Sequence, residues 1–178
     1  RLVALDGRYN LNNLRRADGS IDALQYALFE RLLRLLGLKA ELAAAITDWI
    51  DADRTPRFPG GAEDAEYALE RPPYAAANRP LVSVGELRAV RGIDAAAWAK
   101  LAPLLAALPQ SGPLDVASAP GALLAALAGR IGSDDRAAWA DLEAARDGRD
   151  CASVESCVGE LPAGVELAVG GDWFELHA

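Results

Sequence analysis

The sequence predicts a mixed α+β protein, with strand patterns at its two ends and helical patterns between them. Residues 2–5 form a short apolar run, and residues 165–169 alternate between apolar and polar or small side chains. The pair Gly170-Gly171 can form a tight turn, after which residues 173–176 continue as a strand. We therefore expect a small antiparallel sheet built from the two termini, with a helical region inserted in it.

Two helices are expected in the first part of the chain. Ser20 is a candidate N-cap, and Gly37 is a candidate stop for the first helix. The apolar face of this helix carries leucines at helical spacing, namely Leu24, Leu28, Leu32, Leu35 and Leu36. A second helix is expected over about residues 40–50, and its C-terminal end delivers Asp51 to the loop that follows.

A new series of helices is expected after Asn78-Arg79-Pro80, which makes this a plausible domain boundary. Ser83 and Glu86 have the spacing of a capping box, so a short helix should end before Gly92. Residues 109–113 are rich in proline and predict a loop. Three further helix starts are predicted, at Asp94, at Ser118 with Pro120, and at Ser133, the last with Trp139 and Leu142 on its inner face.

Six carboxylates gather around a turn rich in proline and glycine. They are Asp48, Asp51, Asp53, Glu63, Asp64 and Glu66. Calcium takes roughly 6–8 oxygen ligands, which a short loop supplies best through carboxylates at alternate positions and backbone carbonyls. Asp51, Asp53 and Thr55 have this alternate spacing, but an EF-hand loop requires Gly at Pro56 and Glu at Ala62. The loop is therefore not an EF-hand.

We expect a structural Ca²⁺ site in this loop, with Asp51, Asp53, Thr55, Glu63 and Asp64 as ligands. The bend at residues 59–61 returns the chain so that the two later acids close the site. A solvated acidic loop is the alternative, because charge runs usually face water. Two arginines, at positions 54 and 57, are too few to neutralise six acids, which favours the metal.

Composition limits the function. The chain has 178 residues, enough for one domain or two small ones, and 52% hydrophobic residues suffice for a packed core. The net charge of −8 argues against nucleic acid and against an anionic membrane surface. No apolar run approaches the ~18 residues of a membrane span, and no signal peptide is present. Because the chain begins at Arg1 within a strand, we expect it to be a trimmed fragment.

Catalysis has few candidate residues. The single histidine, His177, is one residue from the end of the chain, so a Ser-His-Asp or Cys-His arrangement would need an ordered terminus. The motifs G-x-S-x-G, P-loop and H-E-x-x-H do not occur. We therefore expect a protein that is not an enzyme.

Several long stretches of the chain carry a family resemblance. They are LDGRYNLNNL at 5–14, DWID at 48–51, GAEDAEY at 61–67, RPPYAAANRPLVSVGELRAVRG at 71–92 and LDVASAPGALLAAL at 114–127. These stretches resemble the K-class minor pseudopilins of type II secretion systems. The resemblance is weakest over residues 133–178.

This resemblance implies a location and partners. Family members are anchored in the bacterial inner membrane by a long hydrophobic N-terminal helix, which this chain lacks, and the remainder lies in the periplasm. The protein would sit at the tip of the pseudopilus with the I- and J-class minor pseudopilins. There it would initiate or cap the filament that exports folded proteins.

The expected redox state of the two cysteines, Cys151 and Cys157, depends on that location. A zinc site is disfavoured because further Cys or nearby His ligands are lacking. Free thiols would suit a cytosolic protein, whereas disulfides persist in the periplasm. The resemblance therefore implies a disulfide between Cys151 and Cys157.

The helical region resembles two SAM-like or helix-hairpin-helix units inserted in a pilin-like β domain. The expected division is residues 1–8 with 160–178 for the β part, 9–78 for the first unit and 79–159 for the second. The hairpin candidate, residues 90–94, has Asp94 in place of a second glycine, so phosphate binding is not expected. The alternative function is an acidic SAM-like interaction module with a calcium-stabilised loop and an unrelated partner.

Overall fold

The computed structural model describes residues 2–129, 136–159 and 165–176. The strands are β1 (Leu2–Ala4), β2 (Tyr9–Asn10), β3 (Leu105–Ala106), β4 (Leu114–Asp115), β5 (Leu167–Ala168) and β6 (Phe174–Leu176). The α-helices are α1 (Ala23–Leu35), α2 (Leu42–Ile50), α3 (Asp64–Tyr67), α4 (Ala95–Leu101), α5 (Gly121–Leu127), α6 (Arg136–Asp147) and α7 (Val154–Val158). Short 3-10 helices cover Leu11–Leu14 (η1), Val84–Ala89 (η2) and Ala102–Leu104 (η3). The mixed α+β class is confirmed.

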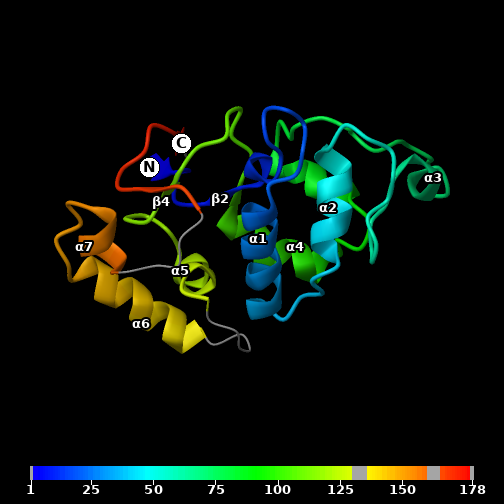
Figure 1. The fold of residues 1–178 in the computed structure, drawn as a ribbon. Coiled ribbons are helices and arrows are strands. Elements are labelled where there is room, and N and C mark those ends of the chain that lie inside the picture. The colour runs from blue at the N-terminus through cyan, green and yellow to red at the C-terminus, as the bar shows by residue number, and fades with distance from the viewer. Residues whose placement is uncertain (1, 130–135, 160–164, 177–178) are drawn as a thin grey trace.

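The two ends of the described chain lie together at one side of the molecule (Figure 1). There β1 pairs antiparallel with β6, with Val3 opposite Glu175, as expected for the strands at residues 2–5 and 173–176. Backbone bonds extend this pairing, since the Leu5 N–H donates to the Trp173 carbonyl at 2.9 Å. The helices α2 and α3 lie at the other side (Figure 1).

The tail does not form the expected hairpin around Gly170-Gly171. Strand β5 pairs instead in parallel with β4, in the described part of the chain, with Leu114 opposite Leu167. The reason is a buried carboxylate: Asp115 Oδ1 accepts the N–H of Gly170 at 2.8 Å and that of Ala117 at 3.0 Å. The Asp115 side chain therefore holds the turn at Gly170 against β4.

Helix α1 is capped by Asp22 and not by Ser20, so that expectation was wrong. Asp22 Oδ1 accepts the N–H groups of Leu24 and Gln25 at 2.9 and 3.1 Å, while the Ser20 hydroxyl donates to Asp18 at 2.6 Å. Asp22 wins because it directly precedes the first helical residue, where a cap is needed. The predicted end of the helix is confirmed, since Gly37 follows it with φ 64°.

The later caps follow the sequence closely. Ser83 and Glu86 form the expected capping box, and Asp94 caps α4 through the Ala97 N–H at 2.7 Å. At α5, however, Pro120 is the residue at the N-cap, and the Ser118 hydroxyl donates to Asp115 at 2.5 Å. Ser133 lies outside the described residues.

One hydrophobic core runs through both expected helical units. Helix α1 packs on α2 at one side and on α5 at the other, and α5 packs on α6. The buried members of the core come from all parts of the chain, among them Leu28, Phe29, Ile46, Leu87, Leu101, Leu105 and Leu123. Whether each unit is SAM-like stays a prediction. Within the described ranges, no helix is long and apolar enough to cross a bilayer.

The asparagines of the RYNLNNL stretch join the two units. Asn12, 6% exposed, donates to the carbonyls of Leu81 at 2.9 Å and Leu108 at 2.8 Å, and accepts the Leu81 N–H at 2.8 Å. Asn10, 5% exposed, accepts the Leu108 N–H at 3.0 Å and donates to the Gln110 carbonyl at 3.0 Å. These amides hold residues 81 and 108–110 beside η1.

Candidate metal centre

Helix α2 positions the first acids of the site. All nine of its residues are buried, Asp48 is fully buried, and Asp51 follows as the C-cap with 2% of its surface exposed. The two acids are three residues apart, which places them on the same face of the helix. At Asp51 the backbone becomes extended, with φ −75° and ψ 177°, and the acidic loop begins.

Asp48 closes the loop. Its Oδ2 accepts the backbone N–H of Arg57 at 3.0 Å and that of Ala62 at 2.9 Å. Gly61 is required between these two contacts, because a Cβ there would collide with Asp48 Oδ2 and with the Arg57 backbone. The sequence placed Asp48 among the six acids but did not predict that it closes the loop. The signal that could have predicted this is its position on an apolar helix, three residues before Asp51.

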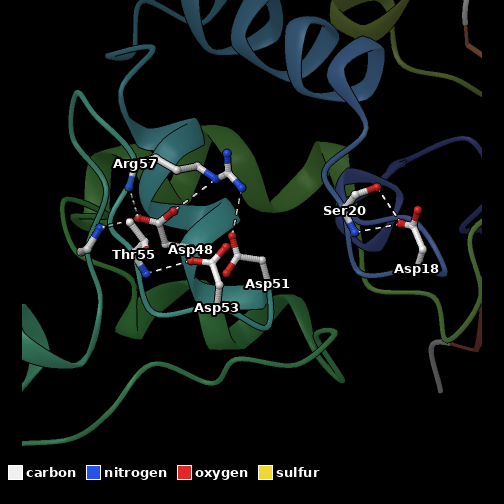
Figure 2. A network of polar contacts seen from close by, with 8 residues as sticks. Asp18, Ser20, Asp48, Asp51, Asp53, Thr55 and Arg57 are labelled. Carbon is white, nitrogen blue, oxygen red and sulfur yellow. Dashed lines mark hydrogen bonds and ion pairs between the residues drawn. The ribbon is translucent and has the colours of Figure 1, made fainter.

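Arg57 reaches back over the two helix acids. Its Nε is 3.3 Å from Asp48 Oδ1, and one terminal nitrogen donates to Asp51 Oδ2 at 3.2 Å. Figure 2 shows the guanidinium facing both carboxylates, with Asp53 next to Asp51 on the other side. The Arg57 side chain as a whole is 36% exposed, although its Nε is buried, so it lies at the rim of the cluster.

Three acids meet at the centre of the loop. One carboxylate oxygen from each of Asp51, Asp53 and Glu63 lies within 4.8 Å of the other two. Glu63 is 2% exposed and faces Glu66 in a capping box at the start of α3, yet neither of its carboxylate oxygens accepts a hydrogen bond of normal geometry. Asp51 Oδ1 is also buried without a partner. Buried polar groups are almost always paired, and buried charges are paired or bind metals. The geometry therefore fits a hard cation at this position.

Burial is costly for these carboxylates in the absence of a cation. Desolvation, together with the negative charges of Asp48, Asp51 and Asp53, raises the pKa of Glu63 to about 7. Desolvation also raises the pKa of Asp48 to about 6, against the backbone donation from Arg57. The pKa of Asp51 is raised by the same cause. A divalent cation would restore the charged forms.

The remaining two predicted ligands lie at the edge of this centre. Thr55 is exposed, and its N–H donates to Asp53 Oδ1 at 2.8 Å in a local turn (Figure 2). Asp64 Oδ1 accepts the Ala76 N–H at 3.0 Å, and its Oδ2 is 3.8 Å from Arg54. The structure thus brings together Asp51, Asp53 and Glu63 of the five predicted residues.

The cysteine pair is bonded in the structure. Cys151 and Cys157 form a disulfide with their Cα atoms 4.3 Å apart. Cys157 lies in α7 and is fully buried in the core, so the bond ties the segment before α7 to the packed part of the molecule.

The hairpin candidate at residues 90–94 packs against α2. Gly92 has φ 85°, and a Cβ there would meet the Leu42 side chain at the start of α2. The Arg91 N–H donates to the Tyr67 hydroxyl at 3.3 Å, so this donor is used inside the protein. His177 lies outside the described residues.

Comparison with known proteins finds one family. A family model described as type II secretion system protein K matches residues 7–110, a stretch that contains the whole acidic loop. A protein K of Pseudomonas aeruginosa is 41% identical over 132 residues, covering 71% of this chain and 39% of the relative. A protein K of Klebsiella pneumoniae is 43% identical over 107 residues, covering 56% and 32%.

A solved structure has the same fold. The crystal structure of the GspK-GspI-GspJ complex from the type 2 secretion system of enterotoxigenic Escherichia coli contains a chain that matches with a TM-score of 0.78 and 26% identity. The match covers 97% of this chain and 65% of the other. The chain thus spans less than two thirds of the proteins it resembles.

Proposed function

The chain belongs to the type II secretion system protein K family, and we propose that it is the periplasmic part of a non-enzymatic minor pseudopilin at the pseudopilus tip. There it would initiate or cap the filament that exports folded proteins. The observation that carries this proposal is the family match over residues 7–110. We further propose a pilin-like β part at 1–8 and 160–178, with SAM-like helical units at 9–78 and 79–159.

The proposed partners are minor pseudopilins of the I and J classes, which are anchored with it at the inner membrane. The solved relative is a complex of GspK with GspI and GspJ, which supports these partners. The terminal sheet supplies an apolar surface for such contacts, since Phe174 is 56% and Leu176 72% exposed. Exposed apolar side chains grouped on one element are typical of interaction sites.

Size-exclusion chromatography with light scattering tests the partners. This chain, mixed at tens of micromolar with the periplasmic domains of I- and J-class pseudopilins, should elute as a heteromeric complex. Phe174→Glu should weaken association at least about tenfold, because it places a charge in the apolar contact. The control is Leu69→Glu, since Leu69 is 83% exposed and follows α3, at the end of the molecule away from the termini (Figure 1). Separate elution of the wild-type proteins would contradict the proposal.

We also propose that the acidic loop binds a structural Ca²⁺. Asp51, Asp53 and Glu63 would supply carboxylate oxygens, with Asp64, the carbonyl near Thr55 or water completing the shell. The unpaired buried oxygens of Glu63 carry this proposal, because a merely solvated acidic loop would not bury them. Ca²⁺ suits the site because it prefers oxygen ligands and tolerates irregular geometry.

Thermal melts test the metal. Calcium added after EDTA should raise the melting temperature by several degrees, because a ligand at a hundredfold excess over its Kd stabilises by about 2.7 kcal/mol. Asp53→Ala with Asp64→Ala should abolish this shift. Equal melting temperatures with and without Ca²⁺, and no heat of binding up to millimolar concentration, would show that the loop is only solvated.

A further inference from the structure

Arg57 is the cation that the chain itself brings to the acidic centre. Its guanidinium contacts Asp48 at 3.3 Å and Asp51 at 3.2 Å, and both acids are almost completely buried. The neighbouring Arg54 is 78% exposed and lies 3.8 Å from Asp64, at the edge of the centre and not against Asp48 or Asp51. Asp48 and Asp51 therefore share the Arg57 guanidinium, and Asp53 and Glu63 adjoin Asp51 in the three-acid group.

The guanidinium and a metal ion would share the same carboxylate. Asp51 Oδ2 accepts a hydrogen bond from Arg57, while Asp51 Oδ1 is buried without a partner and Asp51 belongs to the three-acid group. A divalent ion bound to this group would stand close to a like charge. The cost of that repulsion lowers the affinity for the ion.

The guanidinium is not required to close the loop. Closure depends on the Arg57 backbone, whose N–H donates to Asp48 Oδ2, and on the Ala62 N–H, which donates to the same oxygen. Arg57 Nε is buried without a hydrogen-bond partner, although it lies within ion-pair distance of Asp48. The side chain is also 36% exposed, so it has a path to solvent. Its contribution is therefore mainly electrostatic and separable from the backbone contacts.

We propose that Arg57 acts as a built-in counter-cation, which stabilises the metal-free loop and competes with the divalent ion for Asp51. This inference rests on the calcium site proposed above. In metal-free protein the guanidinium offsets part of the negative charge. When the ion binds, the guanidinium moves toward solvent, and its lost contacts reduce the net affinity. Arg57 thereby sets the Ca²⁺ concentration at which the loop becomes loaded.

Calorimetric titration of Ca²⁺ into the chain and its variants tests this. Arg57→Gln should bind Ca²⁺ at least about tenfold more tightly than wild type, because both the repulsion and the competing contact are gone. The same variant should melt at lower temperature in EDTA. Arg57→Lys keeps the charge but not the guanidinium fork, so its Kd should stay within about threefold of wild type.

Arg16→Gln is the matched control. It removes the same charge from an ion pair of similar length, 3.0 Å to Asp22, and lies outside the acidic loop. Its Ca²⁺ affinity should stay within about twofold of wild type, which separates local competition from the change in net charge. Circular dichroism of each variant with Ca²⁺ establishes that it is folded.

The outcomes separate the two proposals. If wild type binds Ca²⁺ and Arg57→Gln binds it more tightly, both the calcium site and the counter-cation role are supported. If Arg57→Gln binds Ca²⁺ and wild type does not, the competition is supported most directly. If wild type binds and Arg57→Gln binds equally or more weakly, the counter-cation role is overturned while the calcium site stands, and Arg57 instead positions Asp51. If neither binds, both proposals fall. Should Arg57→Gln not fold, a change of more than about threefold in the Kd of Arg57→Lys, in either direction, overturns the electrostatic competition.

Discussion

Two buried polar clusters of this molecule differ in whether their side-chain oxygens and nitrogens have hydrogen-bond partners. Around Asn12, the amide makes three hydrogen bonds of 2.8–2.9 Å to the backbone of Leu81 and Leu108. Glu63 is also buried, and apart from its capping box with Glu66 both of its carboxylate oxygens lack a hydrogen bond of normal geometry. Burial and polarity alone therefore do not identify a site.

The difference separates a structural cluster from a binding site. A satisfied buried network specifies one arrangement of the chain and needs nothing further. An unsatisfied buried network lowers the stability of the folded state until a ligand pairs with its polar atoms. The asparagine cluster should therefore respond strongly to mutation and not to calcium, and the acidic centre should respond to calcium and to pH.

The largest effect is expected at Asn12. Asn12→Ala leaves the Leu81 N–H and the carbonyls of Leu81 and Leu108 without their partner, so the free energy of unfolding should fall by roughly 3–5 kcal/mol. Urea denaturation with and without Ca²⁺ measures it, and the loss should be the same in both. Ser20→Ala, which removes the hydroxyl of the exposed Ser20–Asp18 pair, should change stability by less than about 0.5 kcal/mol. A loss below about 1.5 kcal/mol for Asn12→Ala would contradict the structural role.

A smaller effect is expected from pH in metal-free buffer. The folded-state pKa of Glu63 is about 7 and that of Asp48 about 6, both above their ordinary values of 4.5 and 3.8. At any pH between a group's ordinary pKa and its folded-state pKa, the folded protein keeps a proton on that carboxyl, whereas the unfolded chain releases it. Stability should therefore fall as pH rises from about 5 to 7.5, by about 1–3 kcal/mol.

Denaturant midpoints across this range measure the pH effect. The Asp18 carboxyl, whose pKa is lowered by the Ser20 hydroxyl, titrates below the window and does not interfere. Saturating Ca²⁺ should flatten the profile, because the bound ion keeps the carboxylates charged. A free energy of unfolding that rises with pH over this range in metal-free buffer would refute the assignment of the effect to Glu63 and Asp48.

The smallest and most diagnostic effect is expected from Glu63→Gln. It removes a buried charge without a hydrogen-bond partner, so the metal-free protein should gain about 1 kcal/mol at pH 7.5 while the response to Ca²⁺ is lost. Melting temperatures with EDTA and with Ca²⁺ measure both parts. Glu70→Gln is the control, since Glu70 is exposed and should leave both values unchanged. Destabilisation of metal-free Glu63→Gln would show that the carboxylate has a structural partner.

Much of the fold follows from local signals in the sequence. The capping box at Ser83 and Glu86, the Asp94 cap and the stop at Gly37 were all predicted, because each depends on residues within one helical turn. The strand pairing of the two termini was also predicted, from the short apolar run at residues 2–5 and the strand expected at 173–176. The same local reasoning chose Ser20 over Asp22, because both residues are good caps and only the exact start of the helix decides between them.

The sequence by itself determined the α+β class, the position of the acidic loop and three acids that meet in it, Asp51, Asp53 and Glu63. Only the tertiary structure decided the roles of residues whose partners are distant in the chain. Strand β5 pairs with β4 because Asp115 binds the Gly170 N–H 55 residues away. Asp48 closes the loop, and Arg57 faces the acids, because the turn at residues 57–62 folds back over α2. Spacing along the chain fixes which groups are near one another locally, whereas which buried oxygen finds a partner depends on contacts made only in the folded molecule.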